Sequence, residues 1–222
     1  MRYPVRFPLL VAGLAIAVPG TSADFRLPSA SAHFKLLDPA PSLVTDDRGD
    51  PQKAGPCGGT NTDWGTPRWA ITQVVGGQNL HLRIQETVYH PGHYRVALAV
   101  NHPGELPLDP VTTTRDSDRG PWSVSAEIED SPQIPVLADG LFVHSSFDAD
   151  GQPTRPEGRL DPWETEIELP NINCEKCILQ IVQHMDEHAF NNPGGYSYHQ
   201  CAHLQITADP AKPLSTGWPA ER

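Results

Sequence analysis

Residues 86–98 read ETVYHPGHYRVAL, and this stretch decides the predicted fold. Pro91 and Gly92 are a pair typical of a tight turn, because proline fixes φ and glycine accepts unusual backbone angles. The residues on either side resemble strands, so the stretch predicts a strand, a turn and a second strand. This arrangement places His90 at the turn, and His93 lies just before Tyr94 on the second strand.

Segments with the two-residue periodicity of strands continue on both sides of this stretch. Leu82 and Ile84 alternate with His81 and Arg83, as in a strand that is buried on one face. Strands are expected at residues 69–75, 80–88, 94–100, 122–128, 134–144, 164–169, 178–183 and 198–207, with long loops at 44–69 and 101–121. The pattern predicts an all-β chain, and more specifically an immunoglobulin/fibronectin-like antiparallel β-sandwich with long loops.

The composition agrees with this fold class and excludes some functions. The 222 residues include 24 prolines and 18 glycines, which favours many turns over long helices. The formal net charge is -11, and no basic cluster is present. We therefore expect no binding to nucleic acid, whose phosphates attract basic surfaces, and no adhesion of the mature chain to anionic membranes.

The N-terminal segment has the features of a signal peptide. Arg2 and Arg6 supply the positive charge, and residues 9–18 (LLVAGLAIAV) form an apolar run too short to cross a bilayer. Two cleavage sites compete, one after Ala23 and one after Ala32. Either would give an exported protein, secreted or periplasmic.

Four cysteines in an exported chain predict two disulfides, with three possible pairings. The CxxC of Cys174 and Cys177 could also be a redox or zinc motif, but no second metal-binding pair accompanies it. Cys177 and Cys201 fall on strands expected to be neighbours. We therefore expect a Cys177–Cys201 bridge, which leaves Cys57 to pair with Cys174.

Cleavage after Ala32 would make His33 the first residue of the mature protein. Its imidazole would then stand beside a free α-amine, whose pKa near 8 allows it to lose a proton and bind a metal. With the imidazole of His90, this makes a three-nitrogen set of the kind that copper(II) prefers. By its chemistry alone, His33 could equally be a residue near a frayed terminus, and His93 is a rival to His90.

Four motifs in a fixed order add to this interpretation. They are GPCGG at 55–59, HPGHY at 90–94, CEKCILQ at 174–180 and YHQCA at 198–202. Together with the histidine after the export signal, their order resembles that of the lytic polysaccharide monooxygenases. The resemblance is greatest to the bacterial polysaccharide monooxygenase-like relatives, and the scattered motifs cover most of the mature chain.

The resemblance implies a histidine brace that holds one copper ion. His33 would give its amine and one ring nitrogen, His90 would give the third nitrogen, and Tyr198 would occupy the axial side. These three residues would be both metal-binding and catalytic. The implied activity is oxidative cleavage of glycosidic bonds in chitin, cellulose or another glucan, by a monomer that uses an external electron donor. The expected organisation is a signal peptide at 1–32, a copper-binding domain at 33–210 and a flexible tail at 211–222.

Departures from the family pattern keep a second function open. Members of the family often have Gln or Glu just before the axial aromatic residue, and this chain has Tyr196 and Ser197 there. Gln183, His184 and Glu86 are candidates for the missing polar group near the copper. The alternative function is a non-catalytic copper-binding protein for copper acquisition or storage.

A third reading follows if cleavage falls before Asp24. His33 then has no free amine, and the chain would be a carbohydrate-binding or structural β-sandwich without metal. For a polysaccharide substrate, the candidate contact residues are Trp64, Trp69, Tyr89 and Tyr94. Core packing is the competing explanation for the tryptophans.

Overall fold

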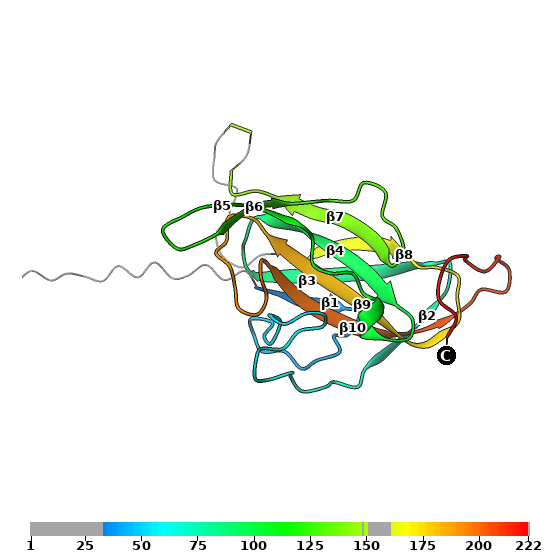
Figure 1. Ribbon diagram of the computed structural model, residues 1–222. Helices are drawn as coiled ribbons and strands as arrows, with labels where there is room; N and C mark the ends of the chain where they lie inside the picture. The colour runs from blue at the N-terminus through cyan, green and yellow to red at the C-terminus, as the bar shows by residue number, and fades with distance from the viewer. Residues whose placement is uncertain (1–32, 148, 151–160, 222) are drawn as a thin grey trace, which may run out of the picture.

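A computed structural model describes residues 33–147, 149–150 and 161–221 (Figure 1). The predicted signal peptide at 1–32 lies outside these residues. Within them, the secondary structure consists of ten strands and one short 3₁₀ helix, so the all-β prediction is confirmed. The strands are β1 (His33–Asp38), β2 (Ile71–Val75), β3 (Asn79–Val88), β4 (Gly92–Ala99), β5 (Thr112–Arg115), β6 (Trp122–Ala126), β7 (Val136–His144), β8 (Trp163–Glu168), β9 (Cys174–Met185) and β10 (Ser197–Thr207), and the 3₁₀ helix η1 is Pro103–Glu105. No helix in the described part of the chain is long and apolar enough to span a membrane.

The strands form three sheets. The first has the order β1-β3-β8, the second β2-β10-β9-β4-β7, and β5 pairs with β6 alone. All pairs are antiparallel except β10 with β2, which is parallel. The strand–turn–strand predicted around Pro91-Gly92 joins β3 to β4, which lie in different sheets. The turn therefore carries the chain from one sheet to the other.

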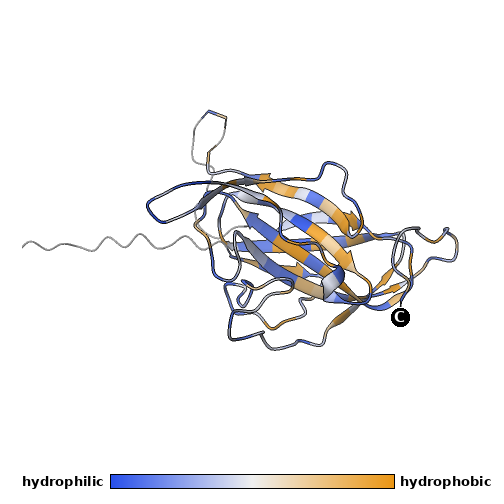
Figure 2. Ribbon diagram, viewed as in Figure 1, coloured by the Kyte–Doolittle hydropathy of each residue, from blue (hydrophilic) through white to orange (hydrophobic). Residues whose placement is uncertain are grey.

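The three-stranded and five-stranded sheets share one apolar core. Leu82 and Ile84 of β3 are fully buried in it, while Arg83 between them is exposed, as the alternation predicts. From the other sheet, Leu179 and Ile181 of β9 join the same cluster. Figure 2 shows that the strands carry most of the apolar residues. Burying such side chains contributes about 1.5–3 kcal/mol each, and this is the main stabilising term of the fold.

Two elements differ from the sequence prediction. Strand β5 lies inside the segment expected to be a loop at 101–121. The sequence did not predict this strand, because TTTR has no alternation of apolar and polar residues. Strand β9 begins at Cys174, four residues before the predicted strand at 178–183, so the CxxC motif lies within the strand. The loop at 44–69 contains no strand, only an isolated bridge between Leu43 and Pro67.

The predicted disulfide pairing is wrong. The bonds join Cys57 to Cys201 and Cys174 to Cys177. Strands β9 and β10 are neighbours as expected, but their register sets Cys201 opposite Gln180 and Cys177 opposite Leu204. Cys177 faces the main core and Cys201 packs with Cys57 in a separate small cluster, so the two sulfurs lie on opposite faces of the sheet.

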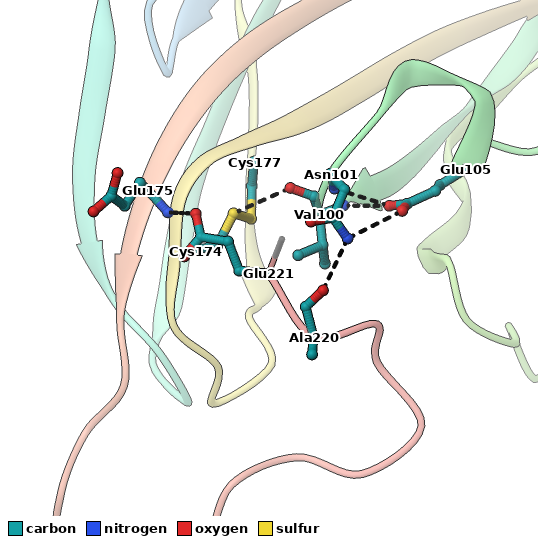
Figure 3. Close-up of a disulfide and its surroundings, with 8 residues drawn as sticks. All are labelled: Val100, Asn101, Glu105, Cys174, Glu175, Cys177, Ala220 and Glu221. Atoms are coloured by element: carbon teal, nitrogen blue, oxygen red, sulfur yellow. Dashed lines mark hydrogen bonds between the residues drawn. A yellow bond between two sulfur atoms is a disulfide. The ribbon is translucent and has the colours of Figure 1, made fainter.

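The C-terminal residues lie against the domain near the Cys174–Cys177 bond (Figure 3). The Asn101 side chain donates to the Ala220 carbonyl over 3.0 Å, and the Glu175 amide donates to the Glu221 carboxylate over 2.6 Å. Trp218 packs against the core cluster. The flexibility expected for 211–222 stays a prediction, and these contacts place residues 218–221 on the surface of the domain.

The two disulfides are expected to differ in their contribution to stability. The Cys57–Cys201 bond closes a loop with a sequence separation of 144, whereas the other has a separation of 3. Since the loss of chain entropy in the unfolded state grows with loop length, replacing Cys57 and Cys201 by Ala should cost about 4–5 kcal/mol. The same change at Cys174 and Cys177 should cost about 2 kcal/mol. Urea unfolding measures both, and equal losses would contradict the prediction.

Candidate metal centre

His33 is the first residue of β1, and it lies next to Tyr198 near the start of β10. Its register partner in β3 is Val88, and its side chain is 2% exposed. The His33 and Tyr198 rings contact each other, with 5.0 Å between their centroids. Tyr198 is fully buried in the core. The fold therefore brings together two of the three residues that the sequence assigns to a copper site.

A carboxylate contacts the His33 ring. His33 Nε2 lies 3.0 Å from Asp50 Oδ2, and the hydrogen bond from His33 is the largest cause of the lowered pKa of Asp50. With Nε2–H donating to Asp50, the lone pair is on Nδ1, towards which Arg48 Nη2 points from 3.5 Å. A carboxylate behind an imidazole is the usual device for orienting a metal-binding histidine. In this structure the Arg48 guanidinium contacts Nδ1, so a metal bound through Nδ1 would displace Arg48.

His90 lies two residues beyond Val88, just before β4 begins. Its Nδ1 is 3.2 Å from the Pro91 carbonyl, and donation from Nδ1–H leaves the lone pair on Nε2. Burial, followed by the nearby charge of His188, lowers the pKa of His90 to about 4. The ring is therefore neutral at physiological pH and able to bind a metal.

The neighbours of His90 include a histidine that the sequence analysis did not select. The His188 ring lies 4.9 Å from the His90 ring, centroid to centroid, in an edge-on contact. His188 follows β9 in a loop with no motif, so no local signal could have placed it there. Its amide donates to Ser123 Oγ over 3.0 Å, and this bond fixes the loop against β6.

His93 lies on the other face of the five-stranded sheet. The cross-strand register aligns Tyr94, Gln183 and Tyr198 in one row, and aligns His93 with His184 in the next. Residues in one row share a face, and adjacent rows alternate. The His93 and His184 rings are 5.3 Å apart on the outer face, whereas Tyr198 points inward. The rival ligand His93 is therefore separated from Tyr198 by the sheet.

A buried carboxylate occupies the inner face beside Tyr198. Glu86 Oε1 accepts hydrogen bonds from Tyr94 Oη over 2.9 Å and from Gln183 Nε2 over 2.7 Å. Glu86 is 3% exposed and stands opposite Phe34 in the β1–β3 ladder. Of the three polar groups left open by the sequence, Glu86 and Gln183 are thus bonded to each other on the Tyr198 side. His184 is on the opposite face.

His144 joins this carboxylate to His90. Its Nδ1 lies 2.8 Å from the Phe142 carbonyl, its Nε2 lies 3.4 Å from Glu86 Oε1, and Nε2 also contacts the His90 carbonyl. Burial lowers the pKa of His144, but its hydrogen bond to Glu86 and the charge of Glu86 outweigh burial and raise the pKa above 6.5. The pair is a buried ion pair whose partners come from β3 and β7, and nothing in the sequence pattern indicates it.

The types of donor atom in the expected brace suit copper, whereas their placement around one ion is a separate question. Among the described residues, no three His, Cys, Asp or Glu side chains are placed around one ion. A histidine brace needs two imidazoles and one amine, and the amine of His33 exists only once the chain is cut before it. Nitrogen donors of this kind suit copper(II). If Asp50 and the Pro91 carbonyl accept from the other ring nitrogens, His33 Nδ1 and His90 Nε2 are the nitrogens that remain to donate.

The candidate substrate-contacting aromatics differ in how far they are exposed. Trp64 and Trp69 have 69% and 77% of their surface exposed, so they are not core residues. Tyr94 is fully buried and bonded to Glu86, so it cannot touch a polymer surface. Tyr89 is half-buried, and its hydroxyl donates to the Ser145 carbonyl over 2.7 Å.

The sequence matches no protein-family model, and no curated protein is significantly similar to it. The likeness to the polysaccharide monooxygenases therefore depends on the sequence motifs alone.

We expect the His144–Glu86 pair to give a characteristic dependence of stability on pH. Because the folded-state pKa of His144 is raised above 6.5, its stabilising effect is complete below pH 6.5 and is lost as pH rises through the folded pKa. The variant His144→Gln leaves Glu86 without its charged partner and should lose about 3 kcal/mol at the acidic end. The loss should shrink at higher pH, as measured by urea unfolding of copper-free protein.

The control is His203→Gln. Burial, followed by the charge of Lys176, lowers the pKa of His203, so this histidine destabilises the fold as pH falls below 6.5. The difference between wild type and this variant should change with pH in the opposite direction. Parallel trends for the two variants would show that the His144–Glu86 interaction is not what sets the pH dependence.

Proposed function

We propose that the mature protein begins at His33 and is an exported, copper-dependent, lytic polysaccharide monooxygenase-like protein. In this proposal His33 and His90 form a histidine brace for one copper ion, with Tyr198 on the axial side. The two large sheets form an immunoglobulin/fibronectin-like β-sandwich that carries the site. The reaction is oxidative cleavage of glycosidic bonds in chitin, cellulose or another glucan, with an external electron donor.

One observation carries the proposal. The imidazole of the residue that follows the expected cleavage site is not loose but is packed against Tyr198 and bonded to Asp50. A residue at a frayed terminus is ordinarily exposed, whereas the His33 side chain is 2% exposed and is bonded to Asp50. A first residue that must bind a metal through its amine and Nδ1 requires both features.

The chain's own groups have separable roles in this proposal. Bound copper would supply one-electron redox chemistry, which no side chain here provides. Asp50 holds the His33 ring, and the Pro91 carbonyl holds the His90 ring. Gln183 pairs with Tyr198 across the strands, and its amide is bonded to the Glu86 carboxyl group. These groups keep the geometry rigid, which a site for redox chemistry requires.

The second candidate is a non-catalytic copper carrier, and a specific observation favours it. The side chains of His33 and His90 are only 2% and 3% exposed, which suits retention of an ion more than contact with a polymer surface. In addition, Glu86 is already engaged by Tyr94 and Gln183. It is therefore not a simple replacement for the Gln or Glu that the family has before the axial residue.

Copper binding should depend on the amine and on His90. A protein that starts at His33 should bind copper(II) tightly and gain about 2.7 kcal/mol of stability at 100 times the dissociation constant. A protein that starts at Asp24 should not. His90→Ala should weaken binding by more than about 100-fold, whereas Asp50→Asn should cost roughly 10–100-fold, as loss of an orienting partner does. Calorimetry and thermal unfolding measure these changes.

His93→Ala is the matched control, since it removes an imidazole of the same strand–turn–strand on the outer face of the sheet. Its copper affinity should equal that of wild type. If His93→Ala lost the affinity and His90→Ala retained it, the ligand assignment would move to the outer face. If the Asp24 form bound copper as tightly as the His33 form, there would be no brace.

A turnover assay distinguishes the monooxygenase function from the copper-carrier function. The copper-loaded protein that starts at His33, given peroxide and a reductant, should release oxidised oligosaccharides from chitin, cellulose or another glucan. Trp64→Ala should reduce both this release and binding to the polymer without changing copper affinity, because Trp64 is 69% exposed and lies by Gly59, next to the Gly58 that approaches the His199 backbone. Tight copper binding with no oxidised product from any glucan would favour the carrier.

A further inference from the structure

A pocket opens beside the β5–β6 hairpin, at the end of the molecule where β4 begins (Figure 1). Its volume is about 260 Å³. Sites that enclose a drug-sized ligand have about 300–1,000 Å³, so this pocket has room for about one six-membered ring. None of the lining residues lies in a sequence motif or in the candidate copper site. The lining consists of Arg115, Ser117, Asp118, Arg119 and Trp122.

Glu187 fixes two of the side chains in this pocket. Its Oε2 accepts hydrogen bonds from Arg115 Nη2 over 2.7 Å and from Trp122 Nε1 over 3.1 Å. The Arg115 guanidinium carbon also lies 5.9 Å from the centroid of the Trp122 ring, within the range of a cation–π contact. The turn after β5 is closed by Ser117, whose hydroxyl donates to the Gly120 carbonyl over 2.6 Å. A pocket held in this way binds a ligand without a large ordering cost.

The loop after β9 joins this pocket to a candidate copper ligand. Glu187 precedes His188, whose ring lies 4.9 Å from the His90 ring, centroid to centroid. On the hairpin, Ser123 follows Trp122, and the Ser123 hydroxyl accepts from the His188 amide over 3.0 Å. The pocket and His90 therefore lie on either side of this one loop.

The walls of the pocket favour a neutral ring that carries hydroxyl groups. The charges of Arg115 and Arg119 are matched by those of Glu187 and Asp118, so an anion gains no net attraction. Guanidinium groups only donate and carboxylates only accept, so a ligand that bonds to both needs groups that do both, as hydroxyls do. The Trp122 indole adds an apolar surface for the C–H groups of a ring. A pyranose meets these requirements, because its hydroxyls surround an apolar ring.

We propose that this pocket is a binding subsite for one pyranose unit of a neutral polysaccharide. Arg115 and Arg119 bond to its hydroxyls, and Trp122 packs against its C–H groups. The pocket is open, so the bound unit stays joined to a chain that continues across the His188 loop towards His90. This inference rests on the proposed function, because it assigns a position to the substrate of that reaction.

The test measures binding of copper-free protein that starts at His33 to cellulose, to chitin, to a soluble β-glucan and to polygalacturonate, which is anionic. Trp122→Ala should weaken binding to the neutral polymer by about tenfold, since it removes the apolar wall. Arg119→Ala should weaken it by about fivefold, since it removes hydrogen-bond donors. Arg119 is exposed in a turn, so this variant folds even if Trp122→Ala does not. The copper(II) affinity of both variants, measured separately by calorimetry, should equal that of wild type.

The matched controls are Trp69→Ala and Arg83→Ala, which make the same changes at exposed positions away from the pocket. The Trp69 ring lies 5.8 Å from Lys176 Nζ, near the first residue of β9, whereas the pocket is near the last residue of that strand. Arg83 lies on β3 and forms an ion pair with Glu164. Neither variant should change polymer binding.

Weaker binding in the two pocket variants, with none in the controls, would support the proposal. Equal losses in the controls, preference for polygalacturonate, or no binding to any of the neutral polymers would overturn it. Self-association that Trp122→Ala abolishes would also overturn it, because the pocket would then be a contact between two copies of the chain. Copper binding without polymer binding would refute the subsite alone, whereas polymer binding through this pocket without copper binding would refute the copper site alone.

Discussion

The pairing register of β4, β9 and β10 is the constraint on which the rest of the structure depends. It puts Tyr94, Gln183 and Tyr198 in one inward-facing row and His93 with His184 in the next row. Because side chains alternate along a strand, a shift of one residue would exchange these two sets. The same register separates Cys177 from Cys201 and so determines which disulfides can form. The inner face of this sheet thus carries Tyr198 and Gln183, and its outer face carries His93 and His184.

Local periodicity was enough to predict the class of fold and most of the strands. Alternation around Leu82 and Ile84 reports burial directly, whereas the polar run of β5 has no such signal. The disulfides could not be predicted, because adjacent strands do not specify their register. By contrast, strand alternation in the sequence already predicts that His93 lies on the opposite side from Tyr94, which favours His90 over His93 as the ligand.

The groups around the candidate site were harder to predict than its three main residues. Asp50, His144 and His188 come from a loop, a sheet edge and a second loop, and none lies in a motif. Their positions follow from tertiary packing, since each is brought to the site by an element distant in the chain. Such contacts appear only when the fold is known. Long-range buried pairs like Glu86 with His144 are also where charge and burial compete most strongly.

The Cys57–Cys201 bond has a consequence for the order of maturation. It fastens the loop that carries Asp50 and Arg48, whose side chains contact the His33 ring. In the proposed function, the terminal amine appears only on cleavage during export, and this disulfide forms only in an oxidising compartment. The copper ligands and the residues that orient them would therefore be completed by two covalent events in the same place. A newly made chain in the cytoplasm would lack both, and so could not take up copper at this site before export.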